Sequence, residues 1–334
     1  MFFSSLTRTQ RALALLLGAT ACVAVIVDCG GEAEPLPNVS TGKLQVSAKM
    51  VAGSIDSPID AIPDPLGSNI FFIATSKGQK GIFKVASDGG PVTTVYLGEP
   101  LVDPHGLSIG AAGDTLFVAD PGADKGGVIF QIPTNGDTPV AVEGTLGLHP
   151  TALDLIDEVA GEALYFTGAD RAGEPAIFKV PAAGGALSEL AHGAPLVRPD
   201  GISVTTKQTV FVADKEAGQG EAGQVFQLQD GKLSICGPEF LPGGVGGLSV
   251  TLDEKRALVS SLDPQKGTSQ VIILDTAAHT AAAFSDVIKE STEAGGMHRA
   301  RYRNVYAWAG KRAVYSVKIK VPLRDSSTIG GPGD

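Results

Sequence analysis

The stretch TLFVADPGADKGGVIFQIP (115–133) occurs twice in this chain, because ALYFTGADRAGEPAIFKVP (163–181) aligns with it without a gap. Each copy contains two short runs of β-branched and aromatic residues, separated by a Gly-rich, acidic segment. Runs of this length that are bounded by turn residues predict β-strands. The chain therefore contains a repeated strand unit, and the period of the repeat indicates the architecture.

Working outward from this pair, we find six copies of the unit, and the copies begin 46–49 residues apart. Each copy holds three apolar runs, and copies one to five have a weaker fourth run. Four short strands in a period of this length are typical of one blade of a β-propeller. The first runs of the copies are SPIDAI (57–62), DPHGLSI (103–109), HPTALDL (149–155), RPDGISV (198–204), GVGGLSV (244–250) and EAGGMHR (293–299).

The sixth copy lacks a fourth run, whereas an extra strand-like segment, KLQVSAKMVAG (43–53), precedes the first copy. Exposed sheet edges favour aggregation, so a propeller ring is expected to close. We therefore predict an all-β, six-bladed β-propeller with four antiparallel strands per blade, in which residues 43–53 join the last blade. On this basis Trp308 and His298 are predicted to pack between blades, and Cys236 to be a small buried filler.

The composition agrees with a globular chain that is exported. Hydrophobic residues make up 43% and charged residues 19%, and the net charge of −10 argues against nucleic acid as a partner. Arg8 and Arg11 precede the apolar run 12–27, which is short for a membrane span but suits an export signal.

The N-terminal cysteines suggest a bacterial lipoprotein. Cys29 follows the apolar run and begins a Pro/Gly-containing segment, and Cys22 is the alternative lipidation site. A plain signal peptide or an uncleaved anchor is the other interpretation. The expected domains are an export segment (1–28), a tether (29–42), the propeller (43–321) and a C-terminal tail (322–334). The expected location is the cell envelope, as an outer-membrane or periplasmic lipoprotein, or outside the cell.

The predicted binding residues lie where the first strand of each blade begins, at the mouth of the central channel. The residue after the aligned Pro, or after its substitute, is expected to point toward the channel, and function in such scaffolds resides in loops. Acidic loops on the same face add further carboxylates. The mouth positions are Ile59, His105, Thr151, Asp200, Gly246 and Gly295, and the predicted ligand-binding residues are His105, Asp200, Thr151, Asp103, Asp120 and Asp214.

One pentapeptide, GLSIG (106–110), matches the G-x-S-x-G nucleophile elbow of α/β-hydrolases. Its serine recurs at the same place in two other copies, as Ser203 and Ser249. An elbow also needs a helix after the serine, and a strand is predicted here instead. We therefore assign Ser108 to the repeat and predict no catalytic residue.

The elements PHGLSIGAAGDTLFVAD (104–120) and RPDGISV resemble blades of NHL-repeat proteins and of the gluconolactonase and senescence-marker-protein family, over roughly residues 57–317. Members of that family hold a divalent metal through a Glu that opens the first blade, two Asn, one of them in a P-N-G element, and an Asp in a P-D-G element. Asp200 matches the P-D-G Asp, His105 stands at the P-N-G Asn, and SPIDAI has no Glu. The resemblance implies a propeller, and at most a metal at His105 and Asp200.

Two functions follow as hypotheses. The first is a monomeric, envelope-anchored binding propeller without a cofactor, whose acidic loop face takes a small ligand, a cation or a protein, and which meets the membrane only through its N-terminal anchor. The second is a divergent metal-dependent lactonase or hydrolase centred on His105 and Asp200, in which the metal activates water. Imidazole and carboxylate suit Zn²⁺ or Mn²⁺, and the loop DPGADKGG (120–127) loosely resembles an oxygen-rich Ca²⁺ loop.

Overall fold

The computed structural model of the chain describes residues 45–240, 245–263, 265–284, 288 and 296–320, all of which lie in the compact unit Pro35–Asp334. The predicted export segment, tether and tail, with Cys22, Cys29 and the mouth residue Gly295, lie outside the described residues. Within the described residues, no helix is long and apolar enough to cross a membrane.

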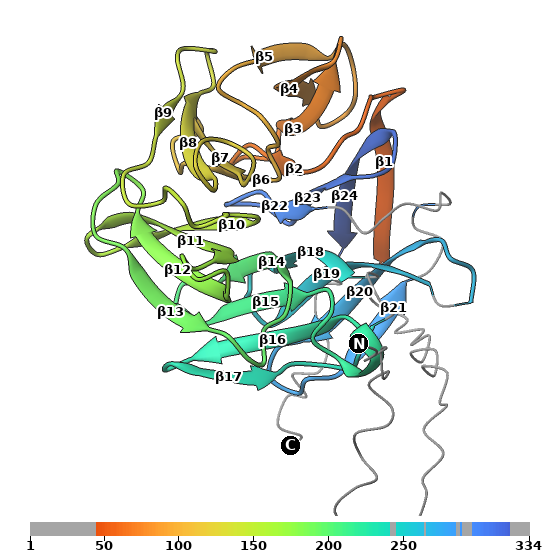
Figure 1. Ribbon diagram of the computed structural model, residues 1–334. Coiled ribbons are helices and arrows are strands. Elements are labelled where there is room, and N and C mark those ends of the chain that lie inside the picture. The colour runs from red at the N-terminus through yellow and green to blue at the C-terminus, as the bar shows by residue number, and fades with distance from the viewer. Residues whose placement is uncertain (1–44, 241–244, 264, 285–287, 289–295, 321–334) are drawn as a thin grey trace, which may run out of the picture. The chain divides into compact units, whose positions relative to one another are not determined.

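Six antiparallel sheets of four strands each form a ring, with the first strand of each sheet toward the centre (Figure 1). The prediction of an all-β, six-bladed propeller is confirmed. The first three blades, each in order from the inner strand, are β2 (Ala61–Pro63), β3 (Asn69–Ser76), β4 (Gln79–Ala86) and β5 (Thr93–Leu97); β6 (Gly106–Ile109), β7 (Thr115–Asp120), β8 (Val128–Pro133) and β9 (Val140–Ala141); and β10 (Leu153–Glu158), β11 (Gly161–Ala169), β12 (Pro175–Pro181) and β13 (Ser188–His192).

The last blade is completed by the first strand of the described chain. β1 pairs with β24 from Gln45↔Lys320 to Gly53↔Ala313, so the predicted closure by the N-terminal strand is confirmed. A short 3₁₀ helix, η2 (Gln219–Glu221), lies in a blade-four loop. The remaining blades are β14 (Pro199–Val204), β15 (Val210–Asp214), β16 (Gln224–Gln229) and β17 (Lys232–Ile235); β18 (Val245–Val250), β19 (Arg256–Leu262), β20 (Ser269–Asp275) and β21 (Ala281–Phe284); and β22 (Met297–Arg299), β23 (Val305–Ala309), β24 (Ala313–Lys320) and β1 (Gln45–Gly53).

The core is divided into six apolar clusters, one between each pair of neighbouring blades. Strand β7 shows why the middle strands are continuously apolar. Leu116 and Val118 pack toward blade one, whereas Phe117 and Ala119 pack toward blade three. Successive side chains of a strand point to opposite faces, so a strand buried on both faces needs an unbroken apolar run.

The residues predicted to be core residues are buried. Trp308 is fully buried in the cluster between blades five and six, and Cys236 is fully buried between blades four and five. Burial raises the pKa of the Cys236 thiol to about 11, with a smaller contribution from Asp275. A thiol of this kind is an inert packing group, as predicted.

Glycines bring the inner strands together at the centre of the ring. A Cβ on Gly201 would lie 2.3 Å from the backbone oxygen of Gly246 in the next blade, and a Cβ on Gly106 would lie 2.5 Å from that of Thr151. Side chains do not fit there, because real Cβ contacts are longer than 3.0 Å. The Gly of the P-x-G element therefore sets the spacing of the channel wall.

Candidate functional site

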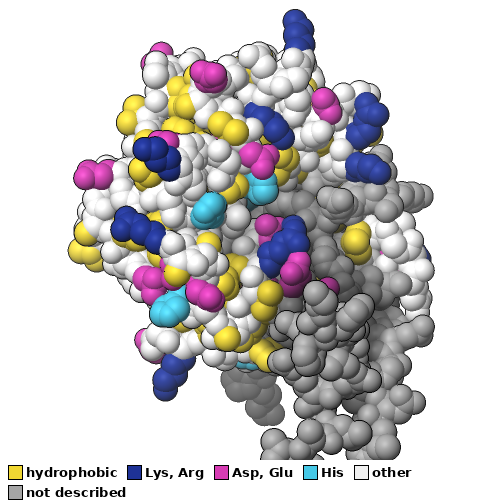
Figure 2. Space-filling view, viewed as in Figure 1, with side chains coloured by type: hydrophobic (Ala, Val, Ile, Leu, Met, Phe, Trp, Pro, Cys, Tyr) yellow, Lys and Arg dark blue, Asp and Glu magenta, His cyan; other side chains and the backbone are white. Residues whose placement is uncertain are grey.

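The antiparallel order of each blade gives the ring two different faces. One face carries the loops that lead into the inner strands and the loops between second and third strands, and we call it the loop face. The other face carries the short turns between first and second strands, and we call it the turn face. Figure 2 shows histidine, acidic and basic side chains beside one another near the centre of the ring, with apolar side chains among them.

In blade two, Asp120 fixes the loop that leads to the channel mouth. It is fully buried at the end of β7, and its carboxylate accepts hydrogen bonds from the backbone N–H groups of Val102 (2.8 Å) and Asp103 (2.9 Å). It also accepts from the N–H groups of Gly122 (3.1 Å) and Ala123 (2.9 Å). A carboxylate has about four acceptor sites, so little capacity is left for a ligand.

Blade four repeats this arrangement with Asp214. This carboxylate is also fully buried, and it accepts the N–H groups of Val197 (2.9 Å), Arg198 (3.0 Å) and Glu216 (3.0 Å). The sequence predicted Asp120 and Asp214 as ligand-binding residues. The structure gives both a role inside the loops, where each carboxylate ties the loop before the inner strand to the loop after the second strand.

The fixed loops hold two apolar side chains in solvent. Val102 is 56% exposed and Val197 is 53% exposed, at equivalent positions of blades two and four. Each is followed by an exposed charged residue, but the charges are opposite, Asp103 in blade two and Arg198 in blade four. In blade three Leu146 is 48% exposed on the corresponding loop. Three neighbouring blades thus present apolar side chains around the mouth.

The predicted residue His105 lies at the mouth beside two charged residues. Its Nε2 is 3.3 Å from a carboxylate oxygen of Asp103, whose other oxygen is 3.7 Å from Nζ of Lys80 at the start of β4. The side chains of His105 and Asp103 are 39% and 53% exposed. The geometry therefore joins two of the predicted residues, His105 and Asp103, with Lys80, which the sequence analysis did not identify.

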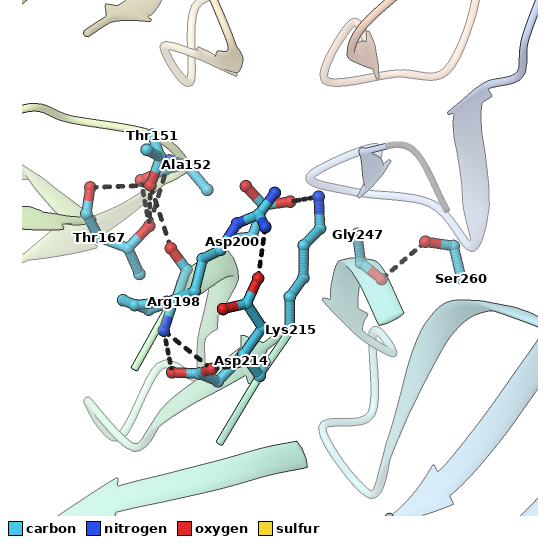
Figure 3. A network of polar contacts seen from close by, with 11 residues as sticks. Thr151, Ala152, Thr167, Arg198, Asp200, Asp214, Lys215, Gly247 and Ser260 are labelled. Atoms are coloured by element: carbon cyan, nitrogen blue, oxygen red, sulfur yellow. Dashed lines mark hydrogen bonds and ion pairs between the residues drawn. The ribbon is translucent and has the colours of Figure 1, made fainter. Parts of the chain in front are cut away.

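Asp200 lies across the mouth in blade four and is paired with a lysine (Figure 3). Its carboxylate contacts Nζ of Lys215, the residue that directly follows β15, and both side chains are largely buried. Arg198 forms a more exposed pair with Glu216 at 2.5 Å. The sequence does distinguish Lys215. Copy four has a lysine directly after VFVAD, where copy two has a proline after LFVAD.

Thr151 uses its hydroxyl within the wall of the channel. Its Oγ1 lies 2.9 Å from Oγ1 of Thr167 and 3.2 Å from the backbone oxygen of Pro199 in the next blade (Figure 3). The neighbouring mouth residue Ile59 packs against the core between blades one and two. Thr151 therefore connects blades three and four, and the polar side chains that reach solvent at the mouth belong to blades two and four.

These donors do not fit a resident metal. Among the described residues, no group of three or more His, Cys, Asp and Glu side chains could hold a metal ion. His105 and Asp200 have different partners, and a cation at Asp200 would have to displace the ammonium group of Lys215. The metal site that the family resemblance implies is therefore not supported by the donor set.

A second polar cluster, which the sequence analysis missed, lies inside the channel between blades six and one. Nε2 of the buried His298 is 2.9 Å from Oδ2 of Asp60, which also accepts the N–H of Leu107 (2.7 Å) from blade two. Burial alone lowers the pKa of His298, but the Asp60 carboxylate, helped by Asp154, raises it above the ordinary value overall. Asp60 thus connects three blades.

Two arginines occupy the end of the channel at the turn face. Arg299 donates from Nε to the backbone oxygen of Val250 (2.8 Å), and burial lowers the pKa of its guanidinium. Arg301 reaches from blade six to blade three, where Nη1 is 2.7 Å from Asp157 and Nη2 is 3.2 Å from the oxygen of Leu155. The two ends of the channel therefore differ in exposure and in the way their charges are used.

Solved structures share this fold at low sequence identity. A gluconolactonase from Xanthomonas campestris has a TM-score of 0.61 and 16% identity, over 86% of this chain and 97% of that one. A nidogen/laminin complex has a TM-score of 0.59 and 16% identity (83% and 98% covered), and a putative TolB from Agrobacterium tumefaciens has 0.59 and 14% (83% and 98%). No protein-family model and no curated protein matches the sequence. At these identities the similarity establishes the propeller fold alone.

Proposed function

We propose that this chain is an exported, membrane-anchored binding propeller that uses the loop face around the channel mouth to hold a protein, a small ligand or a cation. The observation that carries the proposal is the pair of loops fixed by Asp120 and Asp214. Each loop is held by backbone hydrogen bonds, and each presents an exposed valine next to a charged residue.

A fixed loop suits binding because little conformational freedom is lost when a partner arrives. Exposed apolar side chains with charged neighbours also combine the two ingredients of a protein interface, an apolar centre and a polar rim. Blades two and four carry charges of opposite sign at the same position, Asp103 and Arg198. A partner would therefore be oriented by a complementary pair of charges.

The alternative is a metal-dependent lactonase, and one observation favours it. Asp200 stands in a P-D-G element, and a gluconolactonase is among the structures with this fold. The ion pair between Asp200 and Lys215 weighs against this function, because the ammonium group already neutralises the carboxylate. Chemistry at a metal would require Lys215 to move away and further ligands to assemble.

Site-specific crosslinking tests the binding proposal. A photo-crosslinking amino acid is placed in the full chain at Val102, at Val197, or at the control position Ile235, which is 60% exposed on the outer strand β17. In the envelope of the cells that make the protein, we expect one defined adduct from the two loop positions and none from Ile235. Equal labelling at all three positions, or no adduct at the loops, would contradict a protein as the partner of the loop face.

Metal analysis separates the two functions. The purified protein is exposed to Zn²⁺, Mn²⁺ or Ca²⁺ and desalted, and the bound metal is measured together with that of His105→Ala and Asp200→Ala. Stoichiometric metal that is lost in both variants, with lactone hydrolysis in the unaltered protein, would establish the lactonase. We expect no such coupled loss, because the two side chains have separate partners.

A further inference from the structure

The turn face carries large apolar side chains at the tips of its turns. Leu66 is 63% exposed, Val159 is 110% exposed, Leu252 is 47% exposed and Tyr302 is 50% exposed. They lie on the turns between first and second strands in blades one, three, five and six. Such turns favour Gly, Asn, Asp and Ser for conformational reasons, and an apolar tip stabilises neither the turn nor the core. What draws attention to these four side chains is that they all lie on one face of the ring.

Hydrogen bonds join these turns into one layer. The N–H of Tyr302 donates to the oxygen of Pro65 (3.0 Å), next to Leu66, and the N–H of Leu252 donates to Oδ1 of Asn304 (3.0 Å). Arg301 extends the layer to Asp157 near the end of β10, two residues before Val159. The apolar tips thus project from a connected surface.

Basic side chains accompany the apolar tips. Lys207, Lys255 and Arg303 are exposed on the turns of blades four, five and six. In the part of the chain that the structure describes, none of the three forms an ion pair. Of the acids on this face, Asp157 and Asp253 are paired with arginines, Glu254 accepts hydrogen bonds from Thr206, and Asp114 is exposed on the turn of blade two. Apolar tips beside unpaired cations are the combination by which proteins attach to a lipid surface, because the cations meet phosphate groups and the tips enter the interface.

The described chain begins at this same face. Val305, the first residue of β23, directly follows the blade-six turn and pairs with Lys318 near the end of β24. Lys320, the last residue of β24, in turn pairs with Gln45, the first residue of β1. Fifteen residues separate the predicted lipidation site Cys29 from Gln45. A segment of this length spans at most about 50 Å even when fully extended.

We propose that the turn face docks on the lipid surface of the anchoring membrane, with Leu66, Val159, Leu252 and Tyr302 at the headgroup boundary and the loop face directed away from it. The docking goes beyond the proposed function but rests on it for the membrane anchor. It also explains why the binding loops and the start of the described chain lie at opposite faces. A partner would then reach the mouth without meeting the membrane.

The test reads the position of each face relative to lipid. Full chains that carry Cys22→Ser and keep the predicted lipidation site Cys29 receive a single new cysteine, through Val159→Cys on the turn face or Val102→Cys on the loop face, and a polarity-sensitive fluorophore. The lipid-modified Cys29 has no free thiol, and the natural Cys236 is buried and does not react. Both proteins are reconstituted into vesicles of phosphatidylethanolamine and phosphatidylglycerol that contain a spin-labelled lipid. Since they share one N-terminal segment, any difference between them reports the orientation of the propeller.

We expect the fluorophore at position 159 to shift to the blue and to be quenched by the spin-labelled lipid, and the fluorophore at position 102 to remain aqueous. Adding Leu66→Asp and Leu252→Asp to the Val159→Cys protein should reduce the quenched fraction about fivefold or more, because charges replace two of the inserted tips. Both residues are exposed, so folding is unaffected, and circular dichroism checks this.

Three results would overturn the docking. These are an aqueous signal at position 159, equal quenching at both positions, or a shift at position 159 that rises with protein concentration in the absence of vesicles. The last would identify a second copy of the chain as the occupant. Metabolic labelling with a fatty acid tests the anchor separately, and crosslinking at Val102 tests the loop face. If the labelling or the crosslinking gives a negative result, the lipid contact measured at position 159 is still a separate result.

Discussion

The mouth and the interior of the central channel use charged residues in opposite ways. At the loop face, Asp103 and Asp200 form ion pairs whose side chains keep some contact with solvent. Deeper in the channel, Asp60 and His298 form a pair with side chains only 4% and 10% exposed. Exposed pairs contribute little to stability, whereas breaking a buried pair leaves an uncompensated charge. Binding capacity therefore lies at the solvent-facing mouth, and ring closure depends on the buried interior of the same channel.

Removing the buried imidazole is expected to cause the largest loss of stability. His298→Ala leaves the Asp60 carboxylate buried with only backbone donors, and we expect a loss of about 3 kcal/mol or more in the free energy of unfolding. Urea denaturation followed by circular dichroism measures this loss. The matched control is His105→Ala at the mouth, for which we expect less than about 0.5 kcal/mol. Equal losses in the two variants would show that His298 does not close the ring.

The same pair predicts a pH dependence on the alkaline side. The folded-state pKa of His298 is raised above its ordinary value of 6.5 by Asp60 and Asp154, which outweigh the opposing effect of burial. The folded protein therefore holds this proton more tightly than the unfolded chain, and the resulting stability is fully present below about pH 6.5. It is lost as the pH rises through the raised pKa.

Urea denaturation at a series of pH values from about 5 to about 9 measures this loss. The His298→Gln variant, in which residue 298 no longer titrates, should lose the alkaline decline, while His105→Gln should keep it. A decline that persists unchanged in His298→Gln would assign it to another group.

A smaller effect is expected from the arginine that crosses the channel at the turn face. Arg301→Met removes the bonds to Asp157 and to the oxygen of Leu155, and we expect a loss of about 1–2 kcal/mol, because the arginine is largely buried but Asp157 is 62% exposed. Arg198→Met, which breaks an exposed pair at the loop face, should cost less than about 0.5 kcal/mol. Thermal unfolding of both variants measures the two losses. A larger loss for Arg198→Met than for Arg301→Met would contradict this expectation.

The repeat predicted most of the fold because a propeller blade is specified by local signals. Strands buried on both faces must be continuously apolar, and the glycines of the P-x-G element mark the narrow centre of the ring. Copy six lacks a fourth run, and residues 43–53 form a surplus strand. The simplest arrangement places this strand in the last blade, and the pairing of β1 with β24 confirms it. These features depend on a period and on residue size, and both can be read from a sequence.

The buried network was harder to predict because it depends on exceptions to the repeat. Asp60 occupies the position at which four other blades have Gly and blade three has Ala152, and Gly296 provides the space, since a Cβ there would lie 1.8 Å from Oδ1 of Asp60. Asp154 and His298 occupy the position of the repeated serine, and Ser203 shows what this position does. Its hydroxyl donates to Asp154 (3.1 Å) and accepts from the N–H of Val250 (3.1 Å). Deviations between copies, aligned by position, were the signal.

The mouth residues were predicted by position but their partners were not. His105, Asp103 and Asp200 lie where the repeat placed them, whereas Lys80 at the start of β4 and Lys215 directly after β15 lie outside the aligned element. A lone sequence does not specify which loop side chain meets which carboxylate, because loops differ in length between the blades. Asp120 and Asp214 were chosen for their charge, and their burial at strand ends follows only from the hydrogen bonds to the neighbouring loop.

A small effect on stability is expected at the pair of Asp200 and Lys215. Lys215→Met should cost no more than about 1 kcal/mol, because both side chains retain some contact with water. Its larger consequence is electrostatic, since it leaves an unpaired carboxylate at the mouth.

If Lys215 takes the place that a cation would occupy, Lys215→Met should bind Mn²⁺ or Ca²⁺ more tightly than the unaltered protein. Adding Asp200→Asn to this variant should abolish the gain, and isothermal titration calorimetry measures all three proteins. An unchanged affinity in Lys215→Met would mean that the ammonium group does not control cation binding at this end of the channel. The largely buried pair would then serve to shape the mouth beside Arg198 and Val197.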